Sequence, residues 1–269
     1  MRDVRPAAVA GTFYPGNAAE LAVAVRECLA GTAAPVAPAA SPKALIVPHA
    51  GYVYSGPIAA GAYARLASLR STIRRVVILG PTHRVAVRGL ALPSARAFAT
   101  PLGEVEVDRV AVATLAGLRQ VVVSDSAHAL EHSLEVQLPF LQSVLDDFRI
   151  VPLAVGDASP GEVAEVLDRL WGGPETLVVV SSDLSHFHGY AQAREIDRAS
   201  ADRILALDGP LDHEEACGAT PINGLLLCAR RRGLAPELID LRNSGDTAGD
   251  RSRVVGYASF AFAGERAHG

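Results

Sequence analysis

The stretch LVVVSSDLSHFH, residues 177–188, decides the fold class, because an apolar run passes directly into a cluster of polar residues. Short apolar runs of this kind are typical of strands that are buried on both faces, as in a parallel sheet. Four further runs share the pattern: ALIVP (44–48), VVIL (76–79), VVVS (121–124) and IVPLAV (150–155). Because longer amphipathic segments alternate with them, the sequence predicts an α/β fold around a mostly parallel sheet.

The segments between these runs carry apolar residues at helical spacing. They are GPIAAGAYARLASL (56–69), SLEVQLPFLQSVL (133–145) and SPGEVAEVLDRLW (159–171), and we expect Ser133 and Ser159 to act as N-caps. The alternating segment SRVVGYASFAFAG (252–264) predicts a closing strand. An alanine- and proline-rich connector lies at 30–43, but a first piece of about 30 residues is too short for its own core, so we expect one domain over 1–269.

Composition and charge exclude several classes of protein. The chain is 49% hydrophobic and 20% charged with a formal net charge of −4, so it lacks the basic surface that nucleic acid requires. No apolar stretch reaches the length of a membrane span, and the opening residues lack the apolar run of a signal peptide. The three cysteines show no paired spacing. We therefore expect a cytoplasmic protein that binds neither nucleic acid nor membrane.

Polar motifs follow the predicted strands at one edge of the sheet, where open α/β sheets bind their ligands. These motifs contribute His49 (VPHAGYVYSG), His83 (LGPTHR), His132 with Glu135 (EHSLEVQLPF), and Asp183 with His186 (SSDLSHFH). Histidines that converge at strand ends are suited to hold a metal ion. The sequence therefore predicts a metal-binding pocket at the carboxyl ends of the parallel strands.

Each of these residues also has an ordinary structural interpretation. A single histidine can be a hydrogen-bonded structural residue, and Glu135 can belong to a helix cap as well as to the pocket wall beside His132. Tyr52 and Tyr54 can close the pocket or pack as aromatic side chains. The glycines around these tyrosines match neither the dinucleotide fingerprint nor the P-loop, so no nucleotide cofactor is expected.

Cys217 differs from the other two cysteines because it directly precedes an apolar helical segment, CGATPINGLLL (217–227). A thiol near a helix N-terminus experiences the positive end of the helix dipole, which favours the thiolate needed for metal binding or nucleophilic attack. Cys28 and Cys228 lie among alanine and leucine and fit the alternative, a small buried hydrophobic residue.

Read together, these motifs resemble the Memo family, also called AmmeMemoRadiSam system protein B. The likeness covers nearly the whole chain through an ordered series: AGTFYPG (10–16), IVPHAGYVYSG (46–56), ILGPTHR (78–84), TPLGEVEVD (100–108), EHSLEVQLPFL (131–141), VVSSDLSHF (179–187), CGATPI (217–222) and GYASFAF (256–262). The resemblance implies a three-layer αβα sandwich similar to class III extradiol dioxygenases, which are non-haem iron enzymes.

The resemblance also implies a pocket of residues matching His49, His83, Asp183, His186 and Cys217 that binds copper or iron. Phe13 stands where the animal relative has a pocket-lining tryptophan. The dioxygenases use two histidines and a carboxylate as ligands, whereas here the third ligand place falls to Cys217, and a thiolate favours copper(I), zinc or sulfur-bound iron. The family name further implies radical SAM and AMMECR-type partner proteins.

Three functions follow for this pocket. In the first, a redox enzyme, the metal ligands are His49, His83 and Cys217, while His186, oriented by Asp183, acts as acid or base on a small substrate. In the second, a metal- or ligand-binding module works with partner proteins without turnover. In the third, Cys217 is a covalent nucleophile with His186 as its base.

Overall fold

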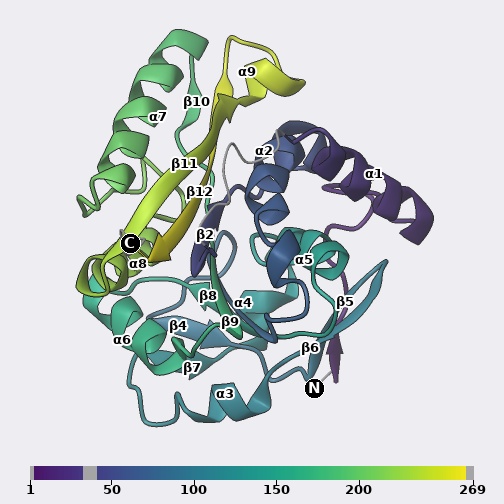
Figure 1. Cartoon of the computed structure of the whole chain (residues 1–269), viewed down its shortest axis with the longest axis vertical. Coiled ribbons are helices and arrows are strands. Elements are labelled where there is room, and N and C mark those ends of the chain that lie inside the picture. The colour runs from purple at the N-terminus through teal and green to yellow at the C-terminus, as the bar shows by residue number, and fades with distance from the viewer. Residues whose placement is uncertain (1–2, 33–40, 265–269) are drawn as a thin grey trace.

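Figure 1 shows the computed structural model, which describes residues 3–32 and 41–264. Within these residues the main sheet has nine strands, and its four central ones run parallel: β2 (Ala44–Val47), β9 (Thr176–Ser181), β3 (Arg75–Pro81) and β8 (Arg149–Val155). The predicted connector at 30–43 lies largely in residues 33–40, outside the described part of the chain.

Other strands extend both sides of this parallel centre. On the β2 side β12 (Val254–Gly264) is antiparallel to β2, and β10 (His186–His188) and β11 (Leu234–Asn243) pair with β12. On the other side β4 (Leu90–Leu92) is antiparallel to β8 and carries β7 (Val121–Val123) in parallel. A separate small sheet contains β1 (Val4–Arg5), β5 (Ala97–Thr100) and β6 (Gly103–Glu106).

Helices cover both faces of the main sheet (Figure 1). One layer contains α1 (Ala18–Ala30), α2 (Tyr52–Ala64) and α5 (Leu138–Val144), and the other contains α6 (Pro160–Leu170), α7 (Tyr190–Leu205) and α8 (Ala219–Arg231). The shorter helices are η1 (Ala67–Leu69), α3 (Arg109–Ala113), α4 (Asp125–Ala129), η2 (Glu135–Gln137) and α9 (Ser244–Thr247). The predicted three-layer αβα architecture is therefore confirmed.

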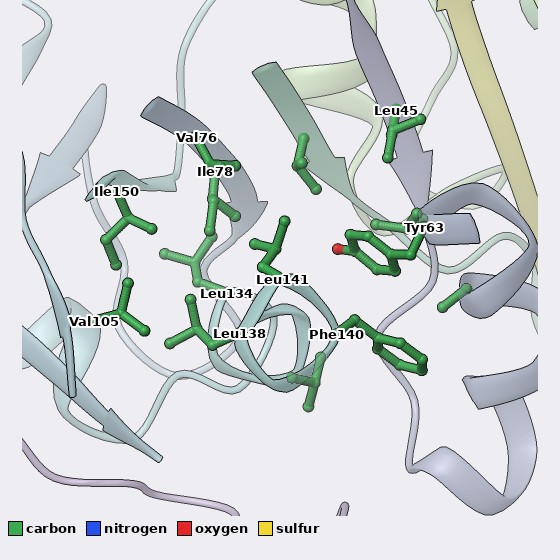
Figure 2. Close-up of a cluster of buried hydrophobic side chains, with 14 of the residues drawn as sticks. Leu45, Tyr63, Val76, Ile78, Val105, Leu134, Leu138, Phe140, Leu141 and Ile150 are labelled. Atoms are coloured by element: carbon green, nitrogen blue, oxygen red, sulfur yellow. The ribbon is translucent and has the colours of Figure 1, made fainter. Parts of the chain in front are cut away.

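Alternation along the central strands builds the two hydrophobic cores. In β2, Leu45 and Val47 face the core beneath α2 and α5, while Ala44 and Ile46 face the core beneath α6 and α8. Figure 2 shows the first core, in which Tyr63 and Phe140 stack with ring centroids 5.1 Å apart. All four β2 side chains are buried, which explains why the strand has no polar alternation.

The two predicted helix caps differ in outcome. Ser159 caps α6 and forms a capping box with Glu162, as expected. Ser133 is not a cap, and that prediction was wrong: its hydroxyl donates to the carbonyl of Pro81 at 3.0 Å, and the chain becomes helical only at η2. The Ser133 hydroxyl is thus bonded to the last residue of β3 and does not cap a helix.

Three parallel strands deliver polar residues to one edge of the sheet. His49 lies two residues beyond the end of β2, His83 two beyond β3, and Asp183 two beyond β9. Because β12 is antiparallel to β2, the loop before β12 reaches the same edge. In the described ranges, no helix is both long and apolar enough to cross a membrane.

Candidate metal centre

Three imidazoles converge beyond the ends of the parallel strands. His49, His83 and His132 each offer a ring nitrogen, and these three atoms lie within 4.8 Å of one another. The rings of His83 and His132 stack with centroids 4.6 Å apart, and the ring of His49 meets both edge-on. Three imidazole nitrogens at this spacing form a donor set that suits iron, copper or zinc.

The hydrogen bonds around His49 fix its tautomer. Its Nδ1 lies 2.9 Å from the Ser181 hydroxyl, which donates its own hydrogen to the carbonyl of Ser133. Ser181 must therefore accept from His49, so Nδ1 carries the proton and Nε2 keeps its lone pair. Burial lowers the pKa of His49 to about 3, aided by His83, and this keeps the ring neutral. A neutral ring with a free Nε2 is the form that ligates a metal.

Glu131 holds the other two histidines. Its carboxylate accepts from the backbone N–H and from Nδ1 of His83, at 2.7 and 2.8 Å, and from the N–H groups of His132 and Ser133. Although burial opposes it, the hydrogen bonds from His83 hold the pKa of Glu131 far below its usual range. An ionised carboxylate on Nδ1 leaves Nε2 of His83 as the ligand atom and increases its basicity.

Cys217 lies beside this cluster, at the N-terminal end of α8. Its Sγ is 3.3 Å from Nε2 of His49 and accepts a hydrogen bond from the backbone N–H of Asp183 at the same distance. The expected effect of the helix dipole does not dominate here, since burial and the nearby Asp183 carboxyl raise the pKa of the thiol to about 12. Within residues 3–32 and 41–264 the imidazole that Cys217 contacts is His49, with no hydrogen bond to His186.

Asp183 and His186 are held separately. The Asp183 carboxylate accepts from the backbone N–H of His49 at 2.7 Å, and its second oxygen is 4.0 Å from Nε2 of that ring. His186 lies in β10, and its Nδ1 contacts the carbonyl of Leu184 at 2.8 Å. That carbonyl can only accept, so Nδ1 of His186 carries a proton, and in the neutral form of the ring Nε2 is the acceptor. Asp183 thus orients His49, and the backbone orients His186.

A cavity of about 440 Å³ opens beside the histidine cluster of His49, His83 and His132. The residues that line it include Phe13, Tyr54, His132, Asp183, His186 and Tyr257. The ring of Phe13 contacts that of His132, with centroids 4.7 Å apart. Of the predicted pocket residues, Phe13, Tyr54 and His132 are therefore at the cavity, and His132 also contributes to the histidine cluster.

Two predicted pocket residues lie elsewhere. Tyr52 packs between Tyr14 and Phe140, and its hydroxyl donates to the carbonyl of Val136 at 2.7 Å. Glu135 is fully buried, forms an ion pair with Arg5 and accepts from the backbone N–H groups of Ala8 and Val9. Because the chain is not helical at His132, the three-residue spacing does not place Glu135 on its face. Glu135 anchors the N-terminal segment that carries Phe13.

Sequence reasoning missed Glu131 and Ser181, which hold the imidazoles. The signal for Glu131 was its place next to His132, since a metal-binding histidine usually donates its second N–H to a carboxylate or another acceptor. Ser181 ends β9 and has a buried side chain, so a polar residue at the end of an apolar strand marked it.

Comparisons with known proteins agree with this architecture. A MEMO1 family protein of Ignicoccus hospitalis is 39% identical, over 96% of this chain and 98% of its own length. A MEMO1 family protein of Methanopyrus kandleri is 38% identical, with the same coverage. The solved structure of an uncharacterized Escherichia coli K12 protein, JW3007, shares the fold at 16% identity, with a TM-score of 0.53 over 82% of this chain and 99% of that one.

The family comparison covers the whole site. The model of the Memo-like protein family matches residues 5–261, a range that contains the histidine cluster, Glu131, Cys217 and the cavity. The matched range and the identities of the relatives confirm the resemblance carried by the sequence motifs. The chain belongs to the Memo-like protein family.

Proposed function

We propose that this protein holds iron or copper on the histidine cluster and uses it in redox chemistry on a small substrate. Zinc, which has no redox chemistry, would fit the same ligands only in a binding module. The observation that carries the proposal is the geometry of His49, His83 and His132, whose donor atoms lie within 4.8 Å of one another. His49 and His83 are held through Nδ1 by Ser181 and Glu131, which leaves Nε2 as the ligand atom of each ring.

The donor set fits such a metal. Imidazoles bind iron, copper and zinc, and a nearby thiol shifts the preference toward softer ions. Cys217 Sγ points at Nε2 of His49, so it is within reach of an ion on that atom, and the predicted set of His49, His83 and Cys217 remains part of this proposal with His132 added. When bound, a redox-active ion would exchange electrons with a substrate in the adjoining cavity.

The chain itself contributes proton transfer and positioning. His186 lines the cavity with a protonated Nδ1 fixed on the carbonyl of Leu184, so Nε2 is the atom that takes a proton from a substrate. Asp183 holds the backbone of His49 in place. Phe13 and Tyr54 contribute aromatic surface to the wall of the cavity.

Metal analysis of the untagged protein tests the ligand set. We expect His49→Ala, His83→Ala and His132→Ala each to lower bound iron or copper at least tenfold, because the loss of one ligand leaves two imidazoles. His188→Gln is the control, since His188 lies in β10 outside the cluster. Unchanged metal content in the three alanine variants would remove the proposal.

Cobalt(II) substitution tests whether Cys217 is a ligand. A thiolate ligand produces an intense sulfur-to-metal charge-transfer absorption, which we expect in the wild type and not in Cys217→Ser. Cys228→Ser serves as the matched control, because Cys228 is buried in the core beneath α6 and α8. An identical spectrum in Cys217→Ser would restrict the ligands to the histidines.

Oxygen consumption with a panel of catechols and thiol reductants then separates a redox enzyme from a binding module. Turnover that disappears in His49→Ala and falls in His186→Gln supports the enzyme. Metal binding without any turnover favours the module. Association with radical SAM and AMMECR-type proteins stays a prediction from the family resemblance, and co-purification with such proteins tests it.

A further inference from the structure

The cavity beside the histidine cluster has a second wall, formed by the loop that joins α9 to β12. Gly249, Asp250 and Arg253 of this loop line the cavity together with His132 and Asp183. Because β12 is antiparallel to β2, this loop lies at the same edge of the sheet as His49. None of these loop residues has a role in the metal centre described above.

Arg253 presents an unneutralised charge at this wall. Its guanidinium lies over the ring of Phe187, 5.0 Å from the ring centroid, and in the described part of the chain no carboxylate lies within 4.0 Å of it. Stacking on an aromatic face orients the guanidinium but leaves its N–H donors available in the plane. An arginine in this state is suited to bind a carboxylate with two parallel hydrogen bonds.

Asp250, the acidic residue nearest to Arg253 in sequence, already accepts hydrogen bonds from another residue. Asp250 accepts from the backbone N–H and the hydroxyl of Ser252, at 2.9 and 2.6 Å, so it closes its own turn. An anion that enters the cavity therefore meets the unpaired guanidinium of Arg253. It also meets two lining aspartates, Asp183 and Asp250, each of which already accepts a backbone hydrogen bond.

Phe187, on whose ring Arg253 stacks, has a strained backbone conformation. Its φ of 65° lies in the left-handed region, which a bulky side chain rarely adopts, and its side chain is 61% exposed. The pairing of β10 with β12 shifts register between His186 and His188, on either side of this residue. Strain of this kind persists where the surrounding structure requires it, and here it directs an exposed aromatic ring under Arg253 beside His186.

We propose that the cavity binds a small planar ligand that carries a carboxylate, and that Arg253, oriented by Phe187, recognises this carboxylate. The other end of the ligand faces His132, while its ring packs against the aromatic side chains of Phe13 and Tyr54. A volume of about 440 Å³ is adequate for one such molecule. The identification of this ligand as the substrate rests on the proposed metal-dependent function, but the binding preference does not.

Benzoate and benzamide, which share shape and differ in charge, are the probes. Their dissociation constants are measured by calorimetry or ligand-observed NMR on the full chain, both stripped of metal and loaded with it. We expect the metal-free wild type to bind benzoate about tenfold more tightly than benzamide, the size of one charge-assisted contact. Arg253→Gln should abolish this preference and leave benzamide binding unchanged.

Arg251→Gln is the matched control. Arg251 lies two residues away, stacks on Tyr190 with 4.5 Å to the ring centroid, and does not line the cavity, so benzoate should bind this variant as it binds the wild type. Asp250→Asn should keep or increase the preference for benzoate. Equal affinities in the wild type, or an unchanged preference in Arg253→Gln, would overturn the proposal. Because the metal-free protein is measured, a failure of metal binding is seen separately.

Discussion

One carboxylate organises two imidazoles at the residue scale. Glu131 accepts from His83 through both the backbone N–H and Nδ1, and from the backbone N–H of His132. We expect Glu131→Gln to weaken metal binding roughly 10–100-fold, the usual effect of removing such a partner. Competition against a chelating dye measures this, with the exposed Glu104→Gln as control. An affinity within twofold of the wild type would show that Glu131 only stabilises the fold.

Burial of His128 makes the stability of the fold depend on pH in the acid range. Its Nε2 donates to the carbonyl of Ala91 at 2.8 Å, and burial lowers its pKa to about 4, so the ring is neutral at pH 7. The unfolded chain, in which the pKa is about 6.5, binds more protons between pH 6.5 and 4. The stability that neutral His128 provides is therefore complete above pH 6.5 and is lost as the pH falls toward 4.

The variant His128→Gln isolates this contribution. In urea unfolding at a series of pH values, we expect its free energy of unfolding to fall less steeply between pH 6.5 and 4 than that of the wild type. The slope should differ by up to about 1.4 kcal/mol per pH unit, the value for one proton. Parallel curves for the two proteins would mean that other groups account for the acid sensitivity.

At the element scale, α6 and α8 pack closely against each other. A Cβ on Gly224 of α8 would lie 2.3 Å from Cγ1 of Val163 in α6, and 3.3 Å from the backbone nitrogen of Ala164. Glycine at this position lets the two helices approach closely beneath the sheet. This packing supports the helix whose N-terminal end carries Cys217.

Gly224→Ala should therefore destabilise the protein by about 1–3 kcal/mol, the typical result of overpacking a core. Gly161→Ala in α6 is the matched control, because its Cβ would have only the Ser159 hydroxyl within 4 Å, at 3.9 Å, and alanine favours the helix by about 1 kcal/mol. Chemical unfolding of both variants measures the difference. A Gly224→Ala protein as stable as Gly161→Ala would contradict the close approach of the two helices.

At the scale of the whole molecule, the histidine cluster brings together separate parts of the chain. His49 follows β2, His83 follows β3, and His132 precedes η2, so one ion on these ligands joins segments that are distant in sequence. An ion that binds only the folded chain stabilises it by mass action, by about 2.7 kcal/mol at a free concentration one hundred times the dissociation constant.

We therefore expect added iron(II) or copper to raise the melting temperature and a chelator to reverse the change. Differential scanning calorimetry with and without metal measures this, and His49→Ala should show little of the increase. If the wild type and His49→Ala respond equally, the stabilising ion binds elsewhere.

The sequence by itself determined the architecture and the family. The apolar runs that became β2, β3, β8 and β9 carry their own signal, because a strand buried on both faces must be apolar throughout. The polar residues directly beyond these strands, such as His49, His83 and Asp183, could be assigned to one edge since parallel strands end together. The ordered motifs were sufficient for the family, which the comparisons confirmed.

Only the tertiary structure decided which of these residues meet. His132 joins His49 and His83, while Glu135, three positions later, turns to Arg5, because the chain between them is not helical. Likewise the Asp183 carboxylate accepts a hydrogen bond from the backbone of His49 and not from His186. Side-chain direction in a loop has no fixed period, so it follows from the hydrogen bonds that buried polar groups must find in the folded chain.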